Sequence, residues 1–239
     1  MDGFSYYNIF DTKGMEYIVI IAFLLLLIPF WLVLNKKEMI RRQIRRAIGV
    51  LTPSALKIPQ GIFYSKHHTW AYLEKSGTAR IGLDDLLLHI TGDVKLSYRK
   101  EAGETVNRGD LVAEITQDGK TLSVFSPISG KIIAPNAALE ENHEFLNDDP
   151  YGKGWMFKIT PTKWKEEISS CYLAGEATDW LRSEIERYKS FLAMNLTRYP
   201  ADGAHPVLQD GGELSDNSLS GMPPEMWKSF QQEFLHPVS

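Results

Sequence analysis

Cysteine is almost absent from this 239-residue chain, whose only thiol is Cys171. A single thiol excludes an intrachain disulfide and any metal or iron–sulfur site built from several cysteines. His67, His68 and His89 do not have the ligand spacing of a zinc site, so we expect surface or helix-capping roles for them and no bound metal. One thiol also agrees with a reducing compartment.

The chain also lacks an excess of positive charge and the short motifs of common enzymes. Its formal net charge is −4, and its basic residues cluster only at residues 36–46, so we expect no nucleic-acid partner. No nucleophile elbow, phosphate-binding loop or dinucleotide fingerprint occurs. Asp84–Asp85 and Asp148–Asp149 are adjacent pairs whose side chains diverge, so neither forms an acid/base couple. We therefore expect a protein that is not an enzyme, with no catalytic residue and no small-molecule substrate.

One long apolar run is present, from Tyr17 to Leu34, and it contains no charged residue. A run of about 18 or more apolar residues suits a hydrocarbon core roughly 30 Å thick. The run therefore predicts a single membrane-spanning helix, anchored by Tyr17, Phe30, Trp31 and Leu34. Acidic residues before the run argue against a cleaved signal peptide.

Basic residues follow this run directly, at Lys36, Lys37, Arg41, Arg42, Arg45 and Arg46. The positive-inside rule then predicts a bacterial inner-membrane protein with its N-terminus outside, its main domain in the cytoplasm, and membrane lipid as a partner. Residues 36–50 also have the pattern of a basic amphipathic helix. Two interpretations stay open for them: a segment lying on anionic headgroups, or an ordinary stop-transfer flank.

Short alternating runs separated by turn residues predict a β-rich domain after this basic segment. The expected strands are residues 70–73, 78–81, 94–98, 111–115, 122–125 and 155–159, with one short helix at 84–90. By composition we divide the chain into an N-terminal extracytoplasmic segment (1–16), the transmembrane helix (17–34), a basic juxtamembrane helix and linker (35–60), the β domain (61–162), an amphipathic helix region (163–199), a flexible linker (200–224) and a C-terminal aromatic docking segment (225–239).

Two helical patterns follow the β domain. Apolar residues recur at three- and four-residue spacing at Leu181, Ile185, Tyr188, Leu192 and Leu196, which predicts an amphipathic helix. Further on, Trp227, Phe230 and Phe234 share one helical face. Two alternatives stay open for this aromatic face: it docks in the groove of a partner protein, or it packs on the chain's own domain.

Seven sequence blocks in the right order make the β domain resemble the glycine cleavage system H protein, a lipoyl-domain-like carrier. The blocks are YSKHHTW (64–70), IGLDD (81–85), ITGDV (90–94), AGETVNRGD (102–110), SPISGKI (126–132), NAALEEN (136–142) and LNDDPYGKGW (146–155). The resemblance covers residues 64–160. It implies a mainly β fold, the flattened barrel or hybrid-motif β sandwich of the H proteins, with the transmembrane helix before it and amphipathic helices after it.

The resemblance also implies a function that depends on one lysine. In the family, this lysine stands at a hairpin tip, eight residues before the proline of the Ser-Pro-x-Ser-Gly block, and carries lipoate in amide linkage. Eight residues before Pro127 is Gly119, and Thr116 stands where the family has a glutamate. Lys120 is one residue away, and a one-residue shift turns a strand side chain to the opposite face. Because Asp118–Gly119 favours a tight turn, we expect Lys120 to begin the outgoing strand.

Two functions are compatible with these features. The favoured hypothesis is a non-catalytic, membrane-anchored H-protein-like scaffold or accessory subunit of a multi-subunit inner-membrane complex, with an electron-transfer complex as one candidate host. It has no cofactor, and its partners are other protein subunits. The alternative is a lipoyl carrier of a glycine-cleavage-type system, with lipoate on Lys120.

Overall fold

A computed structural model describes residues 17–30, 50–196, 208–209 and 213–236. The chain divides into two units, residues 1–48 and residues 49–239. The predicted N-terminal segment (1–16), the last part of the predicted transmembrane helix (31–34) and the first part of the predicted juxtamembrane region (35–49) lie outside the described residues.

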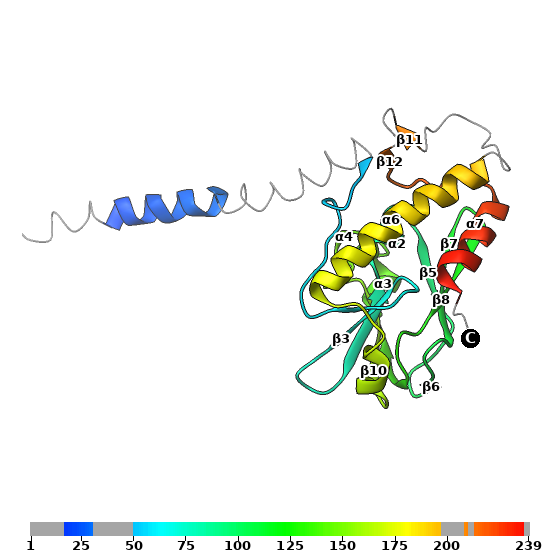
Figure 1. Ribbon diagram of the computed structural model, residues 1–239. Coiled ribbons are helices and arrows are strands. Elements are labelled where there is room, and N and C mark those ends of the chain that lie inside the picture. Colours follow the sequence, from blue (N-terminus) through cyan, green and yellow to red (C-terminus); the bar gives the residue numbers. More distant parts are fainter. Residues whose placement is uncertain (1–16, 31–49, 197–207, 210–212, 237–239) are drawn as a thin grey trace, which may run out of the picture. The chain divides into compact units, whose positions relative to one another are not determined.

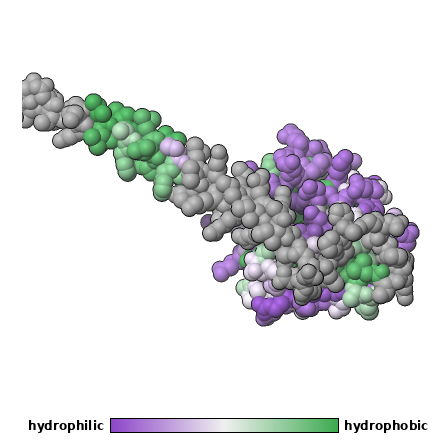
Figure 2. Space-filling model, turned by 90° about the horizontal axis from the view of Figure 1, so that it is seen from above, coloured by the Kyte–Doolittle hydropathy of each residue, from purple (hydrophilic) through white to green (hydrophobic). Residues whose placement is uncertain are grey.

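The first unit contains one described helix, at residues 17–30, and it corrects the predicted membrane anchor. Tyr17 and Phe30 are exposed, and the helix is coloured as hydrophobic in Figure 2. No helix among the described residues is long and apolar enough to cross a membrane, so the predicted span and the inner-membrane localisation that depended on it are wrong. Trp31 and Leu34 lie outside the described residues.

The second unit is mainly β, as the alternating runs predicted (Figure 1). Its strands form a six-stranded sheet in the order β2-β3-β4-β10-β9-β6, a three-stranded sheet in the order β5-β7-β8, and a small sheet in the order β1-β12-β11. Every strand pair is antiparallel. The strands are β1 (Val50–Leu51), β2 (Phe63–Tyr64), β3 (Thr69–Leu73), β4 (Ala79–Leu83), β5 (Lys95–Tyr98), β6 (Thr105–Val106), β7 (Leu111–Gln117), β8 (Lys120–Phe125), β9 (Gly130–Pro135), β10 (Trp155–Pro161), β11 (Leu208–Gln209) and β12 (Glu213–Ser215).

Helices cover the sheets at several points. They are α2 (Asp85–Thr91), α3 (Ala138–Glu141), α4 (Phe145–Asp148), α5 (Trp164–Ile168), α6 (Ala174–Leu196), α7 (Pro224–Phe230) and the π-helix η1 (Gln231–Leu235). Helix α2 begins where the Asp84 carboxylate accepts a hydrogen bond from the Leu87 amide, at 2.8 Å, which satisfies one free N–H of the first turn. Helix α6 buries Leu181, Ile185, Tyr188 and Leu192, as their spacing predicted.

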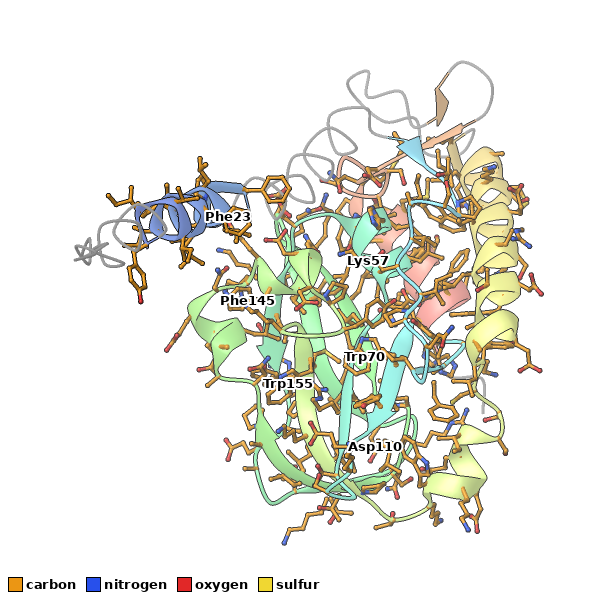
Figure 3. All side chains as sticks on the ribbon, turned by 90° about the vertical axis from the view of Figure 1, so that its left-hand side faces the viewer. Phe23, Lys57, Trp70, Asp110, Phe145 and Trp155 are labelled. Atoms are coloured by element: carbon orange, nitrogen blue, oxygen red, sulfur yellow. The ribbon has the colours of Figure 1, made fainter. Side chains whose placement is uncertain are left out.

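The six-stranded sheet is held by large aromatic side chains. Trp70 on β3 is fully buried and lies over Gly82 of the neighbouring strand β4. A Cβ atom at position 82 would come within 2.6 Å of the Trp70 ring, so only glycine fits there. Trp155 stands opposite Gly82 on the other side, on β10 (Figure 3). The large ring of Trp70 therefore packs over the neighbouring strand at a position where glycine leaves room for it.

Residues 213–236, named here the C-terminal segment, fold onto the sheets and α6. Its first residues form β12, which pairs with β1, and Leu214, Leu219 and Met222 are buried. The amide of Leu219 donates to the carbonyl of Ile90 at the end of α2, at 3.0 Å. These apolar residues and backbone contacts place part of the predicted flexible linker (200–224) on the domain surface. Figure 1 shows α7 beside β8.

Candidate functional site

The candidate site is the β7–β8 hairpin, which corresponds to the carrier hairpin of the resembled family. Asp118 and Gly119 form a two-residue turn, with φ angles of 48° and 78°. Two consecutive positive φ values are typical of the turn that matches the twist of a hairpin, and they favour the Asp-Gly pair. Gln117 pairs with Lys120 across the turn, so Lys120 is the first residue of β8, as predicted.

Lys120 is half-buried, and its amine is held by the C-terminal segment. The Nζ atom donates hydrogen bonds to the carbonyl of Ser220 and to the carbonyl of Met222, the latter at 3.4 Å. It also lies 5.1 Å from the ring centroid of Trp227, a cation–π contact. Carbonyl oxygens and an aromatic face both favour the charged amine, so the side chain is bound along the domain and is not presented to solvent at the tip.

The outer edge of β8 is also covered by the C-terminal segment. The amide of Ser123 donates to Oε1 of Gln231 at 2.6 Å, and Nε2 of Gln231 donates back to the carbonyl of Ser123 at 3.4 Å. One glutamine side chain thus satisfies both backbone groups of a central residue of β8. The hairpin is closed at its first residue and at its middle by the same segment.

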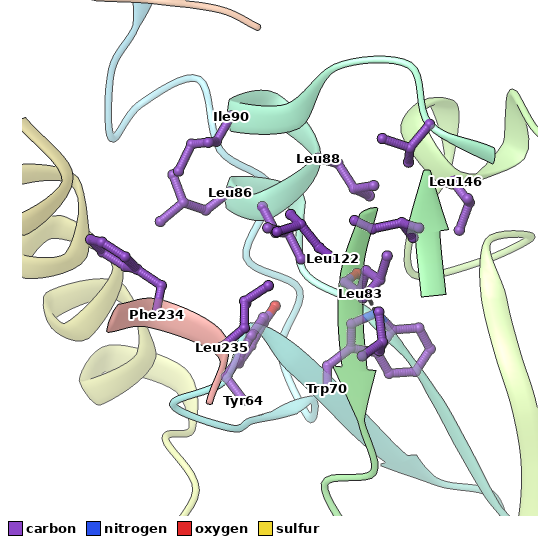
Figure 4. Packing of buried hydrophobic residues seen from close by; sticks show 14 of the residues in the cluster. Tyr64, Trp70, Leu83, Leu86, Leu88, Ile90, Leu122, Leu146, Phe234 and Leu235 are labelled. Atoms are coloured by element: carbon purple, nitrogen blue, oxygen red, sulfur yellow. Dashed lines mark hydrogen bonds between the residues drawn. The ribbon is translucent and has the colours of Figure 1, made fainter. Parts of the chain in front are cut away.

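Trp227, Phe230 and Phe234, predicted to dock on a partner or to pack on the chain's own domain, are buried within the domain. Phe230 and Phe234 stack at 4.7 Å, and both contact the Tyr188 ring of α6 at 5.7 and 6.0 Å. Figure 4 shows Phe234 and Leu235 in the same cluster of buried side chains as Leu86 and Leu122. This arrangement corresponds to the second alternative, and docking on a partner stays a prediction.

A buried ionic junction lies under this aromatic cluster. His68 is fully buried, with Nδ1 2.8 Å from an Asp84 oxygen and Nε2 3.6 Å from a Glu184 oxygen. Burial lowers the pKa of His68, but Asp84 and Glu184 more than offset this effect and raise it to about 9. His68 is therefore a buried cation at neutral pH, and the expected surface or capping role is replaced by a link between β3, α2 and α6.

The junction continues from Glu184 to the C-terminal segment. Burial raises the pKa of Glu184, but His68 and Arg187 outweigh it and hold that pKa below its usual range. Arg187 donates to both Glu184 oxygens at 2.9 Å, and its guanidinium lies 4.1 Å from the centroid of Phe234. It also donates to the carbonyl of Glu233. Asp84, His68, Glu184 and Arg187 thus form a chain of alternating negative and positive side chains that leads to η1.

His89 makes a second ionic contact with the C-terminal segment. Its Nδ1 is 2.8 Å from an oxygen of Asp216, and its Nε2 is 3.6 Å from an oxygen of Asp85. Although burial lowers the pKa of His89, hydrogen bonds to Asp216 and Asp85 raise it to about 9. His67 differs, because burial and the nearby Lys66 lower its pKa to about 4. No cluster of three metal-ligating side chains occurs within the described ranges.

The residues of the hairpin do not fit a lipoyl group as they are arranged. Such a group needs a lysine whose amine projects freely from the turn, and Gly119 occupies the predicted acceptor position without a side chain. The neighbouring amine, on Lys120, is bound to two carbonyl groups. Nothing in the hairpin therefore supports a step through that cofactor in this conformation.

Sequence reasoning missed the residues that close the site, which are Glu184, Asp216, Ser220 and Gln231. Glu184 lies among other charged residues of α6, so its burial had no local signal. The other three belong to polar stretches whose contacts are with residues about 100 positions or more away in sequence. Because Gln231 directly follows Phe230, its position in the sequence could only have suggested that it lies near the buried face of the helix.

Comparison with known proteins agrees with the predicted resemblance. The family model described as glycine cleavage H-protein matches residues 62–184, more than half of the chain. A probable glycine cleavage system H protein of Thermococcus kodakarensis is 35% identical over 127 residues, which cover 53% of this chain and 94% of that protein. The glycine cleavage system H protein of Thermus thermophilus is 36% identical over 106 residues, covering 44% of this chain and 82% of that protein.

A solved structure is also similar: the H protein of Mycobacterium marinum, with 28% sequence identity and a TM-score of 0.41, covering 44% of this chain and 87% of that one. The matched region contains both sheets of the β domain, the β7–β8 hairpin and the first half of α6. The family-model match and the coverage of the Thermococcus and Thermus proteins show that the chain belongs to the glycine cleavage H-protein family.

Proposed function

We propose that this chain is a non-catalytic scaffold or accessory subunit of a multi-subunit assembly, and that it is not a carrier of lipoate. The observation that supports this most directly is the state of Lys120. Its amine is bound to the carbonyls of Ser220 and Met222 and lies against Trp227. Lipoylation would require this amine to leave those partners and to reach the active site of a ligase.

The length of the chain beyond the family domain also supports a role in assembly. The family match ends at residue 184, within α6, whereas the hairpin is covered by residues 213–236. A carrier depends on free movement of its arm from the hairpin tip. A domain whose hairpin edge is closed by its own extension is better suited to act as a rigid body that other subunits contact.

The second candidate function is a lipoyl carrier that uses Lys120. Its support is the family itself, since the resembled H proteins carry lipoate, and the position of Lys120 at the base of a well-formed hairpin turn. In this function the C-terminal segment would have to open before modification. Gly119, which has open space around its Cα, could not substitute for the lysine.

Intact-mass measurement of the natively expressed protein separates the two functions. We expect the mass of the unmodified chain, and no gain in mass when the purified protein is incubated with lipoate, ATP and a lipoate ligase. The control variant is Lys131→Ala, because Lys131 is an exposed lysine on β9. A lipoyl mass increment that persists in Lys131→Ala and is lost in Lys120→Ala would overturn the proposal and establish the carrier.

A further inference from the structure

Strand β8 is the outer strand of the three-stranded sheet β5-β7-β8, so one of its sides has no neighbouring strand. In a hairpin with a two-residue turn, alternate residues from Lys120 to Val124 direct their backbone groups toward β7. The other residues, Thr121, Ser123 and Phe125, direct theirs outward. The contact of Ser123 with Gln231 on this outer side agrees with that assignment.

Gln231 occupies the place of a neighbouring strand at one point of this edge. Its carboxamide has the same acceptor and donor as a peptide group, and it bonds to both the N–H and the C=O of Ser123. Within the part of the chain that the structure describes, the outward backbone groups of Thr121 and Phe125 have no hydrogen-bond partner. The edge therefore retains a free donor and acceptor pair on each side of the occupied Ser123, and an extended chain that displaced Gln231 would meet outward pairs at Thr121, Ser123 and Phe125, two residues apart.

The C-terminal segment, which covers the outer edge of β8, is not a strand of the β5-β7-β8 sheet. The pairing of β5, β7 and β8 is complete without the C-terminal segment. On the hairpin side, the segment contacts β8 through the hydrogen bonds of Lys120 and Gln231 and through a ring contact between His236 and Phe125. On its other side, Phe230 and Phe234 are buried against α6. A peptide that displaces the C-terminal segment from β8 must therefore supply backbone groups that bond to β8. It must also supply apolar side chains that replace those of the segment.

We propose that the outer edge of β8 is a docking surface for an extended segment of a partner protein, which joins by strand addition, and that the C-terminal segment holds this surface closed. The recognised segment has alternating apolar and polar residues. This pattern is required because Leu122 and Val124 are buried on one face of β8, whereas Thr121 is exposed on the other. The inference rests on the proposed function as an interaction subunit.

The probe for this surface is a labelled peptide with the sequence of β7, residues 111–117 (LVAEITQ), which already pairs with the inner side of β8. Its binding is measured by fluorescence anisotropy to the full-length wild type, to Gln231→Ala and to Gln232→Ala, with a scrambled peptide as the reference. Gln232 is the exposed neighbour of Gln231 in η1 and is the matched control. We expect Gln231→Ala to bind at least ten times more tightly than the other two proteins.

The hydrogen bonds at the edge are tested in the Gln231→Ala background. Adding Thr121→Pro removes an outward N–H, and we expect the gain in affinity to disappear, whereas Thr121→Ala, which keeps the N–H, retains it. Hydrogen exchange supplies a readout that does not depend on the proline variant: the peptide should protect the Thr121 and Phe125 amides of Gln231→Ala. Equal binding by wild type and Gln231→Ala, or binding without protection of these amides, overturns the proposal.

These outcomes are independent of lipoylation. A lipoyl group on Lys120 in the native protein would overturn the proposed function, whereas failure of the peptide to bind an unmodified protein would overturn only the strand-addition surface.

Discussion

The C-terminal segment contacts the rest of the domain through two unlike faces. The face toward α6 is aromatic: Phe230 and Phe234 pack on Tyr188 and Phe191, with ring centroids 5.4 to 6.1 Å apart. The face toward the hairpin has polar contacts, those of Lys120 and Gln231, beside a ring contact between His236 and Phe125. Burial of large aromatic rings contributes several kcal/mol, whereas a single hydrogen bond or cation–π contact contributes about 1 kcal/mol.

This difference separates two roles within one short segment. The aromatic face stabilises the docked segment, and the polar face determines which parts of the hairpin are accessible. Changes on the first face should therefore lower the stability of the domain, and changes on the second should alter the hairpin with little effect on stability. Substitutions on each face test whether stability and hairpin accessibility are separate in this way.

The largest effect is expected on the aromatic face, for Phe230→Ala. Phe230 is fully buried, so its removal loses apolar burial and leaves a cavity, which should lower the free energy of unfolding by about 3–5 kcal/mol. Urea denaturation measures this change. The control is Met194→Ala on α6, where the side chain is 62% exposed, and there we expect less than about 0.5 kcal/mol. Similar losses for both variants would mean that the aromatic face does not hold the segment.

Next in size is a loss of stability at alkaline pH from the ionic junction. The folded-state pKa of His68 is about 9, above its ordinary value of 6.5, so the contribution of the bound proton is complete below about pH 6.5 and is lost as the pH rises through about 9. A shift of this size corresponds to about 3 kcal/mol. His89, with a pKa also raised to about 9, should add to the same slope.

Urea denaturation at a series of pH values from 6 to 10 measures this slope. In His68→Gln the part of the slope due to His68 should be absent, because glutamine does not titrate, and His89→Gln should retain it. A wild-type free energy of unfolding that does not fall between pH 6.5 and 9 would contradict the ionic state assigned to both histidines.

A smaller effect is expected for Tyr188→Phe, which tests a polar contact inside the aromatic face. The Tyr188 hydroxyl lies 3.0 Å from the hydroxyl of Ser218, and both residues are buried. Removing one partner leaves the other without its hydrogen bond, at a cost of about 1–3 kcal/mol. A double-mutant cycle with Ser218→Ala measures the coupling. If the two single losses simply add, the hydroxyl groups do not interact in the folded domain.

The sequence predicted the local features of this molecule and missed the distant ones. The Asp118–Gly119 turn, the strands around it and the apolar stripe of α6 each follow from patterns within a few residues. The contact of His68 with Glu184 and that of Lys120 with Ser220 join positions about 100 residues or more apart, and no local pattern encodes such a pair. For the candidate site, the sequence predicted that Gly119 stands in place of the family's lysine. It did not predict that Gln231 covers the outer edge of β8.

The apolar run from residue 17 shows the opposite error, because a strong local signal predicted more than the structure supports. Composition alone predicted a membrane span to Leu34, whereas no helix in the described part of the chain is long and apolar enough to cross a membrane. Hydropathy reports the transfer preference of side chains, and it does not by itself establish a membrane-spanning helix. In α6 the apolar spacing predicted the buried side chains correctly, because that pattern lies within one element.

The smallest effect is expected on the polar face, for Lys120→Met. Methionine keeps the apolar length of the side chain and removes its charge, so the bonds to Ser220 and Met222 and the cation–π contact with Trp227 are lost. Because Lys120 is half-buried, the loss in free energy of unfolding should be at most about 1 kcal/mol, while Lys131→Met, at an exposed position on β9, should change nothing measurable. Hydrogen exchange should nevertheless show faster exchange of the backbone amides around Trp227 in Lys120→Met only. A loss as large as that of Phe230→Ala would place the main support of the segment at the hairpin and would remove the distinction between its two faces.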